Sequence, residues 1–178
     1  MKIALFLIPS LMFAIVDVYN GYKNAQIKKS LLKRSEIKIE KNKKFENIDF
    51  YSKKFSNKKF INCSFFKCKF KNTKFYKVEF ENCIFKKCDF TISSFEFCKF
   101  KHTKIEDSFF LRARLIFTTF LYSSLKRSNL SEAALQNSRF IQTDLSKTVW
   151  IDGKICKEGS IDICKKSEKA KKFKLFIP

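Results

Sequence analysis

The stretch from Phe60 to Phe90 reads FINCSFFKCKFKNTKFYKVEFENCIFKKCDF and decides the fold. Phenylalanine recurs at every fifth residue within it, and the same register stays large and apolar from Phe45 to Trp150. A period of five fits neither an α-helix nor a simple strand, whose side-chain periods are about 3.6 and 2 residues. The period therefore predicts a tightly coiled chain that sends one large side chain per five residues to a common axis. The expected core ladder comprises Phe60, Phe65, Phe70, Phe75, Phe80, Phe85, Phe90, Phe95, Phe100, Phe120, Phe140 and Trp150.

A second register lies two residues before the first and is occupied by small residues from Cys63 to Thr148. The other three positions of each five are mostly polar or charged. A coil with five-residue sides explains both registers. The large residue fills the axis, and the small one fits where the wall comes closest to its neighbours.

The units CSFFK, CDFTI, CKFKH, SNLSE, AALQN and TDLSK resemble the pattern A-[DN]-[LF]-x-x of the pentapeptide-repeat family. The resemblance covers about residues 41–150. It implies an all-β fold, a right-handed quadrilateral β-helix of about five coils with 20 residues per coil. Lys43, Lys53 and Lys58 occupy the small position in the first units. The sequence therefore leaves open whether the first coil, residues 41–60, is regular or is distorted or splayed.

A coil of 20 residues stacks each residue on the one 20 positions later. Cys63 then stacks on Cys83, and asparagines form a corner ladder that can hydrogen-bond from coil to coil. Charged residues outside the two inward registers alternate in sign along two such columns. Because opposite charges on neighbouring strands attract, this alternation supports a coil of 20 residues. These columns are Lys59–Glu79–Lys99 and Lys86–Glu106–Lys126.

The N-terminus carries an apolar run from Ile3 to Val16, after Met1-Lys2 and before Asp17. A spanning helix needs about 20 apolar residues, so residues 1–19 are better explained as a signal peptide. An uncleaved membrane anchor and a buried hydrophobic arm are the alternatives. We expect residues 20–40 to form an N-terminal cap, helical over the amphipathic stretch from Asn24 to Leu32, because a solenoid exposes its core at its ends.

Residues 151–178 are expected to form a C-terminal cap loop and a basic tail. The sequence WIDGKICKEGSIDICK from Trp150 looks like the motif W-x-D-G-x-x-C-x-x-G-S-x-x-x-C that often follows such repeats. Cys156 and Cys164 lie in this loop, outside the repeat, and we expect them to form a disulfide. A disulfide agrees with export to the periplasm or the medium. Two unpaired thiols in a cytosolic protein are the alternative.

No residue pattern points to catalysis, a cofactor or a metal. The chain has 1 His and 3 Gly and no phosphate-binding glycine motif. His102 falls in the asparagine corner column and is expected at the surface. The remaining cysteines share the small inward register, which predicts buried small residues. A metal or redox thiol site is a weaker alternative, because no C-x-x-C occurs. These cysteines are Cys63, Cys68, Cys83, Cys88 and Cys98.

The chain is strongly basic, with 38 Lys+Arg against 17 Asp+Glu and a formal charge of +21. Some pentapeptide-repeat proteins mimic DNA and bind type II topoisomerases, but that role needs an acidic rod. Residues 41–150 carry 23 basic and 10 acidic residues, a net +13, so we reject it here. The simplest explanation of this excess of basic residues is a solvated surface that keeps a Phe-rich rod soluble. The functional alternative is an acidic partner. Candidate interaction residues are Lys67, Lys87, Phe97, Phe117 and Arg127.

The leading hypothesis is an exported, non-catalytic scaffold or protein-interaction module with an unidentified protein partner and no small-molecule substrate. The alternative is a basic rod that binds a polyanion: anionic lipid, lipopolysaccharide or, for a cytosolic protein, nucleic acid. An enzymatic hypothesis would need a thiol site at the cysteine ladder. A dimer through a solenoid end is compatible with each of these.

Overall fold

The computed structural model describes residues 21, 23 and 37–166, of which Gly21 and Lys23 are helical. The expected signal segment, residues 24–36 of the expected helical cap, and the tail from 167 onward lie outside the described residues. Within the part that is described, no helix is long and apolar enough to cross a membrane.

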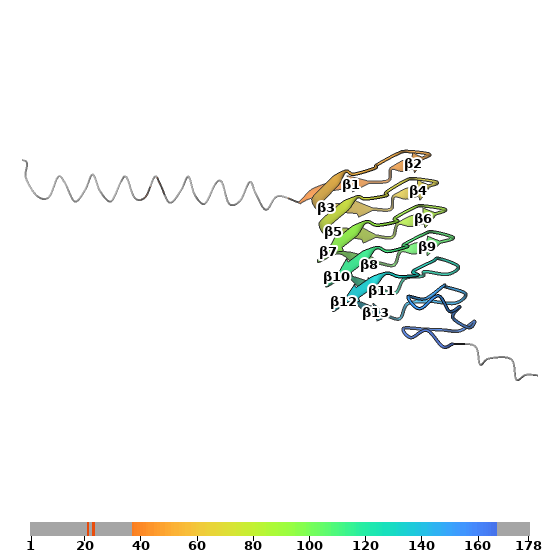
Figure 1. Ribbon diagram of the computed structural model, residues 1–178. Helices are drawn as coiled ribbons and strands as arrows, with labels where there is room; N and C mark the ends of the chain where they lie inside the picture. The colour runs from red at the N-terminus through yellow and green to blue at the C-terminus, as the bar shows by residue number, and fades with distance from the viewer. Residues whose placement is uncertain (1–20, 22, 24–36, 167–178) are drawn as a thin grey trace, which may run out of the picture. The chain divides into compact units, whose positions relative to one another are not determined.

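Residues 38–150 form a stack of four-sided coils, each lying directly on the one before (Figure 1). All pairings between the strands are parallel and join residues 20 apart, such as Phe60 with Phe80 and Phe80 with Phe100. The predicted β-helix and its 20-residue coil are thus confirmed. The strands are β1 (Lys38–Lys41), β2 (Lys44–Glu46), β3 (Lys54–Ile61), β4 (Ser64–Phe66), β5 (Lys74–Glu81), β6 (Ile84–Lys86), β7 (Ser94–Glu96), β8 (Lys99–Lys101), β9 (Lys104–Glu106), β10 (Arg114–Ile116), β11 (Thr119–Leu121), β12 (Ala134–Gln136) and β13 (Arg139–Ile141).

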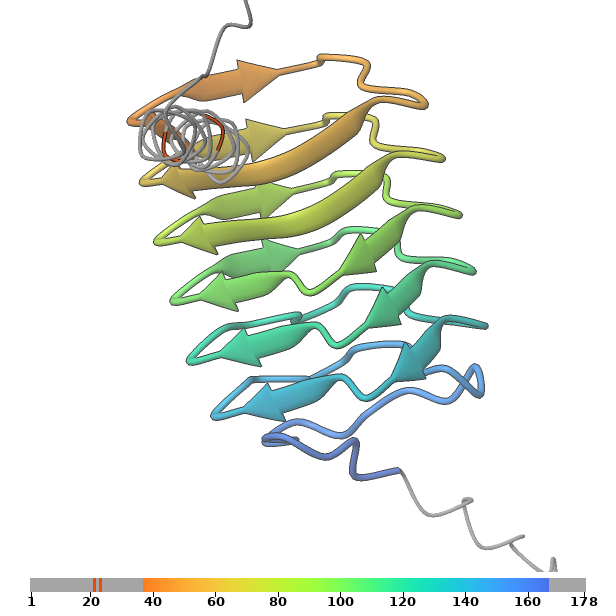
Figure 2. The same ribbon diagram turned by 90° about the vertical axis from the view of Figure 1, so that its left-hand side faces the viewer.

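The sides of the coil differ in how they pair. Two adjacent sides belong to one nine-stranded sheet, in which β3 and β5 run across the shared corner without a break (Figure 2). A third side is the four-stranded sheet β2-β4-β6-β9. The fourth side is held by isolated parallel bridges, such as those that join Asp49, Lys69 and Asp89.

Aromatic rings stack coil upon coil along the axis. The Phe65 and Phe85 centroids lie 4.5 Å apart with nearly parallel planes, and Phe60 lies 5.3 Å from Phe80. Neighbouring rings within a coil meet edge to face, which suits the ring quadrupole. The predicted core ladder is buried from Phe60 to Phe120, whereas Phe140 and Trp150 are partly buried near the C-terminal end.

Every corner of the coil is turned by a residue with positive φ. One residue in five adopts this conformation from Asn42 (φ 55°) to Lys147 (φ 58°). The left-handed region costs most L-residues roughly 1–2 kcal/mol, and Asn is among the few that visit it readily. Asparagine at corners of the early coils therefore favours the turn. Asn62 also donates a side-chain hydrogen bond to Asn42 at 3.2 Å, as expected for the corner ladder.

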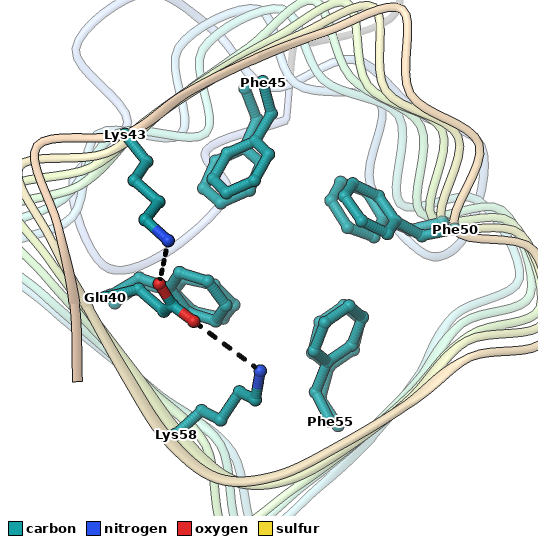
Figure 3. Close-up of a pocket in the computed structure, with 11 residues that line it drawn as sticks. Glu40, Lys43, Phe45, Phe50, Phe55 and Lys58 are labelled. Atoms are coloured by element: carbon teal, nitrogen blue, oxygen red, sulfur yellow. Dashed lines mark ion pairs between the residues drawn. The ribbon is translucent and has the colours of Figure 1, made fainter. Parts of the chain in front are cut away.

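The first coil, whose regularity the sequence leaves open, is regular. β1 already pairs with β3, β2 pairs with β4 in register, and the early corners keep positive φ. The lysines do not strain the wall, because the described residues place no coil before this one and Lys43 and Lys58 extend over the axis there (Figure 3). Strand pairing also begins at Lys38, inside the segment 20–40 that was expected to be a helical cap.

Residues 151–166 fold back onto the last coil and cap it. Cys156 N donates to Thr148 O at 2.8 Å, and Leu145 N donates to Ser160 O at 2.8 Å. Cys156 and Cys164 form a disulfide. Gly153, at φ 76°, adopts a conformation that suits a residue without Cβ. The last coil therefore meets a hydrogen-bonded loop instead of open solvent.

Candidate functional site

One corner of the β-helix exposes stacked aromatic side chains. Phe97 and Phe117 sit at positive φ on consecutive coils, with ring centroids 5.2 Å apart and an interplanar angle of 3°. Tyr76 meets Phe97 edge to face at 5.9 Å. All three are exposed, Phe97 and Phe117 to about half. We call Tyr76, Phe97 and Phe117 the aromatic corner.

The fold does not require aromatic residues at these corners. Asn57 and Asn137 occupy equivalent positions in the same column and turn with similar φ. A phenylalanine there accepts the left-handed conformation without gaining burial. Exposed apolar residues that cost stability without serving the core are typical of binding surfaces. The aromatic corner is therefore the strongest candidate site on the described surface.

Cations and a shallow hollow flank the aromatic corner. Lys77 Nζ lies 5.2 Å from the centre of the Tyr76 ring. Lys99 is exposed and follows Phe97 by two residues in the chain. Neither lysine forms an ion pair with any described residue. A hollow of about 270 Å³ adjoins Tyr76, and Lys54 and Lys74 contribute to its lining. Apolar rings beside cations suit a partner surface that is both apolar and acidic.

The structure divides the predicted interaction residues between surfaces. Phe97 and Phe117 stack as expected. Lys67 and Lys87 turn a different corner, half a coil away in sequence and thus diagonally opposite. Arg127 shares that second corner column, but its Nε donates to Asp107 Oδ1 at 2.7 Å, so its charge is already paired.

The second corner belongs to a broad field of lysines. Between residues 67 and 104, many lysines are exposed and form no ion pair with the described residues. The two expected alternating columns are in register, yet only the Lys59–Glu79 pair makes contact within them, at 3.3 Å. The unpaired lysines are Lys67, Lys69, Lys71, Lys74, Lys77, Lys86, Lys87, Lys99 and Lys104.

The cysteine ladder is part of the wall. Cys83 Sγ donates to Phe60 O at 3.4 Å, and Thr103 Oγ1 makes the equivalent bond to Phe80 O at 3.1 Å. The small register thus supplies a hydrogen-bond donor to the carbonyl oxygen 23 residues earlier, besides being small. Burial raises the pKa of Cys83 and of Cys98 to about 12, which keeps these thiols protonated. These two buried neutral thiols are therefore poor nucleophiles, whereas the hydrogen bond with Cys88 lowers the pKa of Cys68 to about 7.

No cluster of three or more His, Cys, Asp or Glu that could hold a metal occurs in the described residues. His102 is exposed at its corner and stacks on Tyr122 with centroids 5.1 Å apart. This is the surface position that its column predicts.

The N-terminal end carries a second feature that the sequence reasoning missed. Glu40 occupies the large inward register opposite Phe60, and its carboxylate lies between Lys43 (2.5 Å) and Lys58 (4.0 Å) (Figure 3). The Lys43 ammonium lowers the pKa of Glu40 by its hydrogen bond, so the carboxylate stays charged. Counting five residues back from Phe45 would have revealed this acid in the core register.

Comparison with known proteins finds similarity in part of the repeat region. The family model "Pentapeptide repeats (8 copies)" matches residues 93–131 and 110–146. No curated protein matches the sequence. Similar solved structures include the pentapeptide repeat protein Rfr23 from the cyanobacterium Cyanothece 51142, with 12% identity and a TM-score of 0.41 over 64% of this chain and 88% of that one. A trypsin-treated form of QnrB1, a plasmid-mediated fluoroquinolone resistance protein, shows 20% identity and a TM-score of 0.24 over 63% of this chain and 72% of that one.

HetL, a pentapeptide repeat protein involved in heterocyst differentiation regulation from the cyanobacterium Nostoc sp. strain PCC 7120, shows 10% identity and a TM-score of 0.21. The alignment covers 66% of this chain and 91% of HetL. At such low identities and TM-scores, these similarities carry no argument about function. The coil geometry itself defines a β-solenoid. Within this solenoid, residues 93–146 are similar to the pentapeptide-repeat model.

Proposed function

We propose that this chain is a non-catalytic protein-interaction scaffold whose docking surface is the aromatic corner. The observation that carries the proposal is the exposed stack of Phe97 on Phe117 at left-handed positions that favour asparagine. Aromatic residues exposed on a rigid element lose little conformational entropy on binding and are common anchors of protein interfaces.

The surroundings of the corner indicate the chemistry of the partner. Lys77 lies beside the Tyr76 ring, and the exposed Lys99 follows Phe97 by two residues. Neither lysine has an intramolecular ion partner among the described residues. A partner segment that combines an apolar anchor with Asp or Glu would cover the rings and neutralise these cations.

Affinity capture from the producing cells tests this proposal with matched variants. Phe97→Asn with Phe117→Asn should abolish recovery of the partner, whereas Phe109→Asn should leave recovery unchanged. Phe109 is as exposed as Phe97 but lies on another side of the coil. Equal recovery with both variants, or loss with both, would contradict docking at this corner.

We further propose that the protein is exported. The support is the apolar run of residues 3–16 with its basic start, together with the Cys156–Cys164 disulfide in the cap. Cell fractionation, with mass measurement of thiol-blocked protein before and after reduction, tests the proposal. Cytosolic recovery with a free Cys156 thiol would overturn it.

A second candidate function is polyanion binding, and the field of unpaired lysines favours it. Lys67, Lys69, Lys86 and Lys87 lie on neighbouring positions of two coils around one corner. Exposed lysines without partners release counterions when they bind a polyanion, so affinity falls steeply with salt. Retention on heparin or anionic vesicles that weakens with salt would support this function. Absence of retention at low salt would exclude it.

A further inference from the structure

The N-terminal end of the β-helix opens into an aromatic cavity of about 170 Å³. Phe45, Phe50 and Phe55 surround it (Figure 3), and Phe60, the strand partner of Glu40, also belongs to its lining. Phe45, Phe50 and Phe55 are half-buried, unlike the phenylalanines of the central coils.

The cavity exists because one ring is missing. The four successive inward positions from Glu40 to Phe55 present one glutamate and three phenylalanines to the axis. Glu40 pairs in register with Phe60, so the column of stacked rings ends beneath a carboxylate. Phe60 stacks on Phe80 at 5.3 Å, and the described residues place no ring on its other side. A smaller side chain at a core position leaves a space of about the size of the absent group.

The rim of the cavity has a net positive charge. Two ammonium groups face one carboxylate, and Lys43 makes the close pair with Glu40 at 2.5 Å. Lys58 stays 4.0 Å from Glu40, and its Nζ lies 5.6 Å from the centre of the Phe55 ring. Lys58 thus keeps the capacity to pair with a second anion beside the apolar wall. Like charges on two copies would also oppose end-to-end stacking at this face.

We propose that this end of the β-helix binds a small aromatic carboxylate, with its ring against Phe60 and its carboxylate on Lys58. A cavity of about 150 Å³ lined by apolar side chains holds benzene in another protein, so this cavity admits a single six-membered ring. The ring extends the aromatic column, and the carboxylate balances the rim charge. The site is independent of the aromatic corner.

Fluorine NMR titration of the full chain tests the site with three probes that share a fluorophenyl ring and differ in charge. At constant ionic strength and neutral pH, 4-fluorobenzoate should bind saturably in the millimolar range. It should bind about 5-fold more tightly than neutral 4-fluorotoluene, and cationic 4-fluorobenzylamine should bind least. Equal affinity for all three probes, or no saturable binding of 4-fluorobenzoate, would overturn the proposal.

Variants locate the binding. Glu40→Phe supplies the missing ring and should abolish binding, while Lys58→Met should reduce the 4-fluorobenzoate affinity to that of 4-fluorotoluene. Lys104→Met removes an exposed lysine from a distant coil and should change nothing. Lys58→Met alone decides the matter if Glu40→Phe does not fold. Unchanged 4-fluorobenzoate affinity in Lys58→Met would overturn the proposed carboxylate contact.

Discussion

Phe97 and Phe117 stack face to face on consecutive corners, yet both rings remain about half exposed and both residues adopt positive φ. Hydrophobic burial explains a residue in the core, and the turn explains an asparagine at a corner. Neither explains phenylalanine here. At these two positions the observed residues are therefore not the ones that folding alone would favour. Such departures are expected at functional sites.

Replacing Phe97 with Asn should change the free energy of unfolding by less than about 1 kcal/mol. The lost stacking, about 0.5–1.5 kcal/mol, is offset by the greater ease with which Asn adopts positive φ. Urea denaturation monitored by circular dichroism measures the change. Destabilisation by more than about 3 kcal/mol would mean that the ring serves the fold.

Substitutions in the large inward register should, in contrast, strongly lower the free energy of unfolding. Phe80 is fully buried, so Phe80→Asp should unfold the β-helix by placing an unpaired charge among aromatic rings. Lys77→Asp, on an exposed corner only three residues away, should be nearly neutral. Thermal unfolding of both variants distinguishes them. Similar effects would contradict the assignment of inward and outward positions.

The donor role of the small register can be tested at Thr103. Its hydroxyl donates to the carbonyl oxygens of Phe80 and Lys101, both at 3.1 Å. Thr103→Val keeps the shape and should cost about 1 kcal/mol through loss of these bonds. Val78 occupies the same register naturally, so Val78→Thr should be neutral or stabilising. A neutral Thr103→Val would show that only size matters.

Alkaline pH should weaken the fold through the buried thiols. Cys83 and Cys98 have a pKa raised to about 12 in the folded state, against about 9.0 ordinarily. Their full contribution to stability is present below pH 9. It is lost as pH rises toward 12, because the unfolded chain then binds fewer protons than the folded one. The expected loss by pH 11 is about 2–3 kcal/mol per thiol.

Denaturation curves at pH 8 and pH 11 measure this loss. The variant Cys83→Ser with Cys98→Ser keeps small donors at both positions and should reduce the alkaline loss. An unchanged pH dependence in that variant would show that other groups cause the alkaline weakening.

The period of five was sufficient to predict the coil, its 20-residue length and the buried ladder, because each repeat imposes the same inward and outward positions. The two ends were less predictable. At Lys43 and Lys58 the small register is broken. Only the structure shows that these long side chains extend over the axis at a point where none of the described residues blocks them. Because residues 20–40 were assigned to a cap, Glu40 was not recognised as a member of the large inward register.

The candidate site was predictable only in part. The 20-residue coil places Phe97 on Phe117, and their stacking follows. Tyr76 was missed because it precedes a corner and reaches Phe97 diagonally from the previous coil. The pairing of Arg127 with Asp107 was also missed, because column membership alone does not show which charges neutralise one another.

The most direct test of the proposed docking surface is site-specific photo-crosslinking in the producing cells. A photoreactive phenylalanine at position 97 should yield an adduct of one defined mass, and Phe117→Asn in the same chain should abolish it. The same group at position 109 should yield no such adduct. The same adduct from both positions, or an adduct from position 97 that persists in Phe117→Asn, would contradict the aromatic corner as the interaction surface.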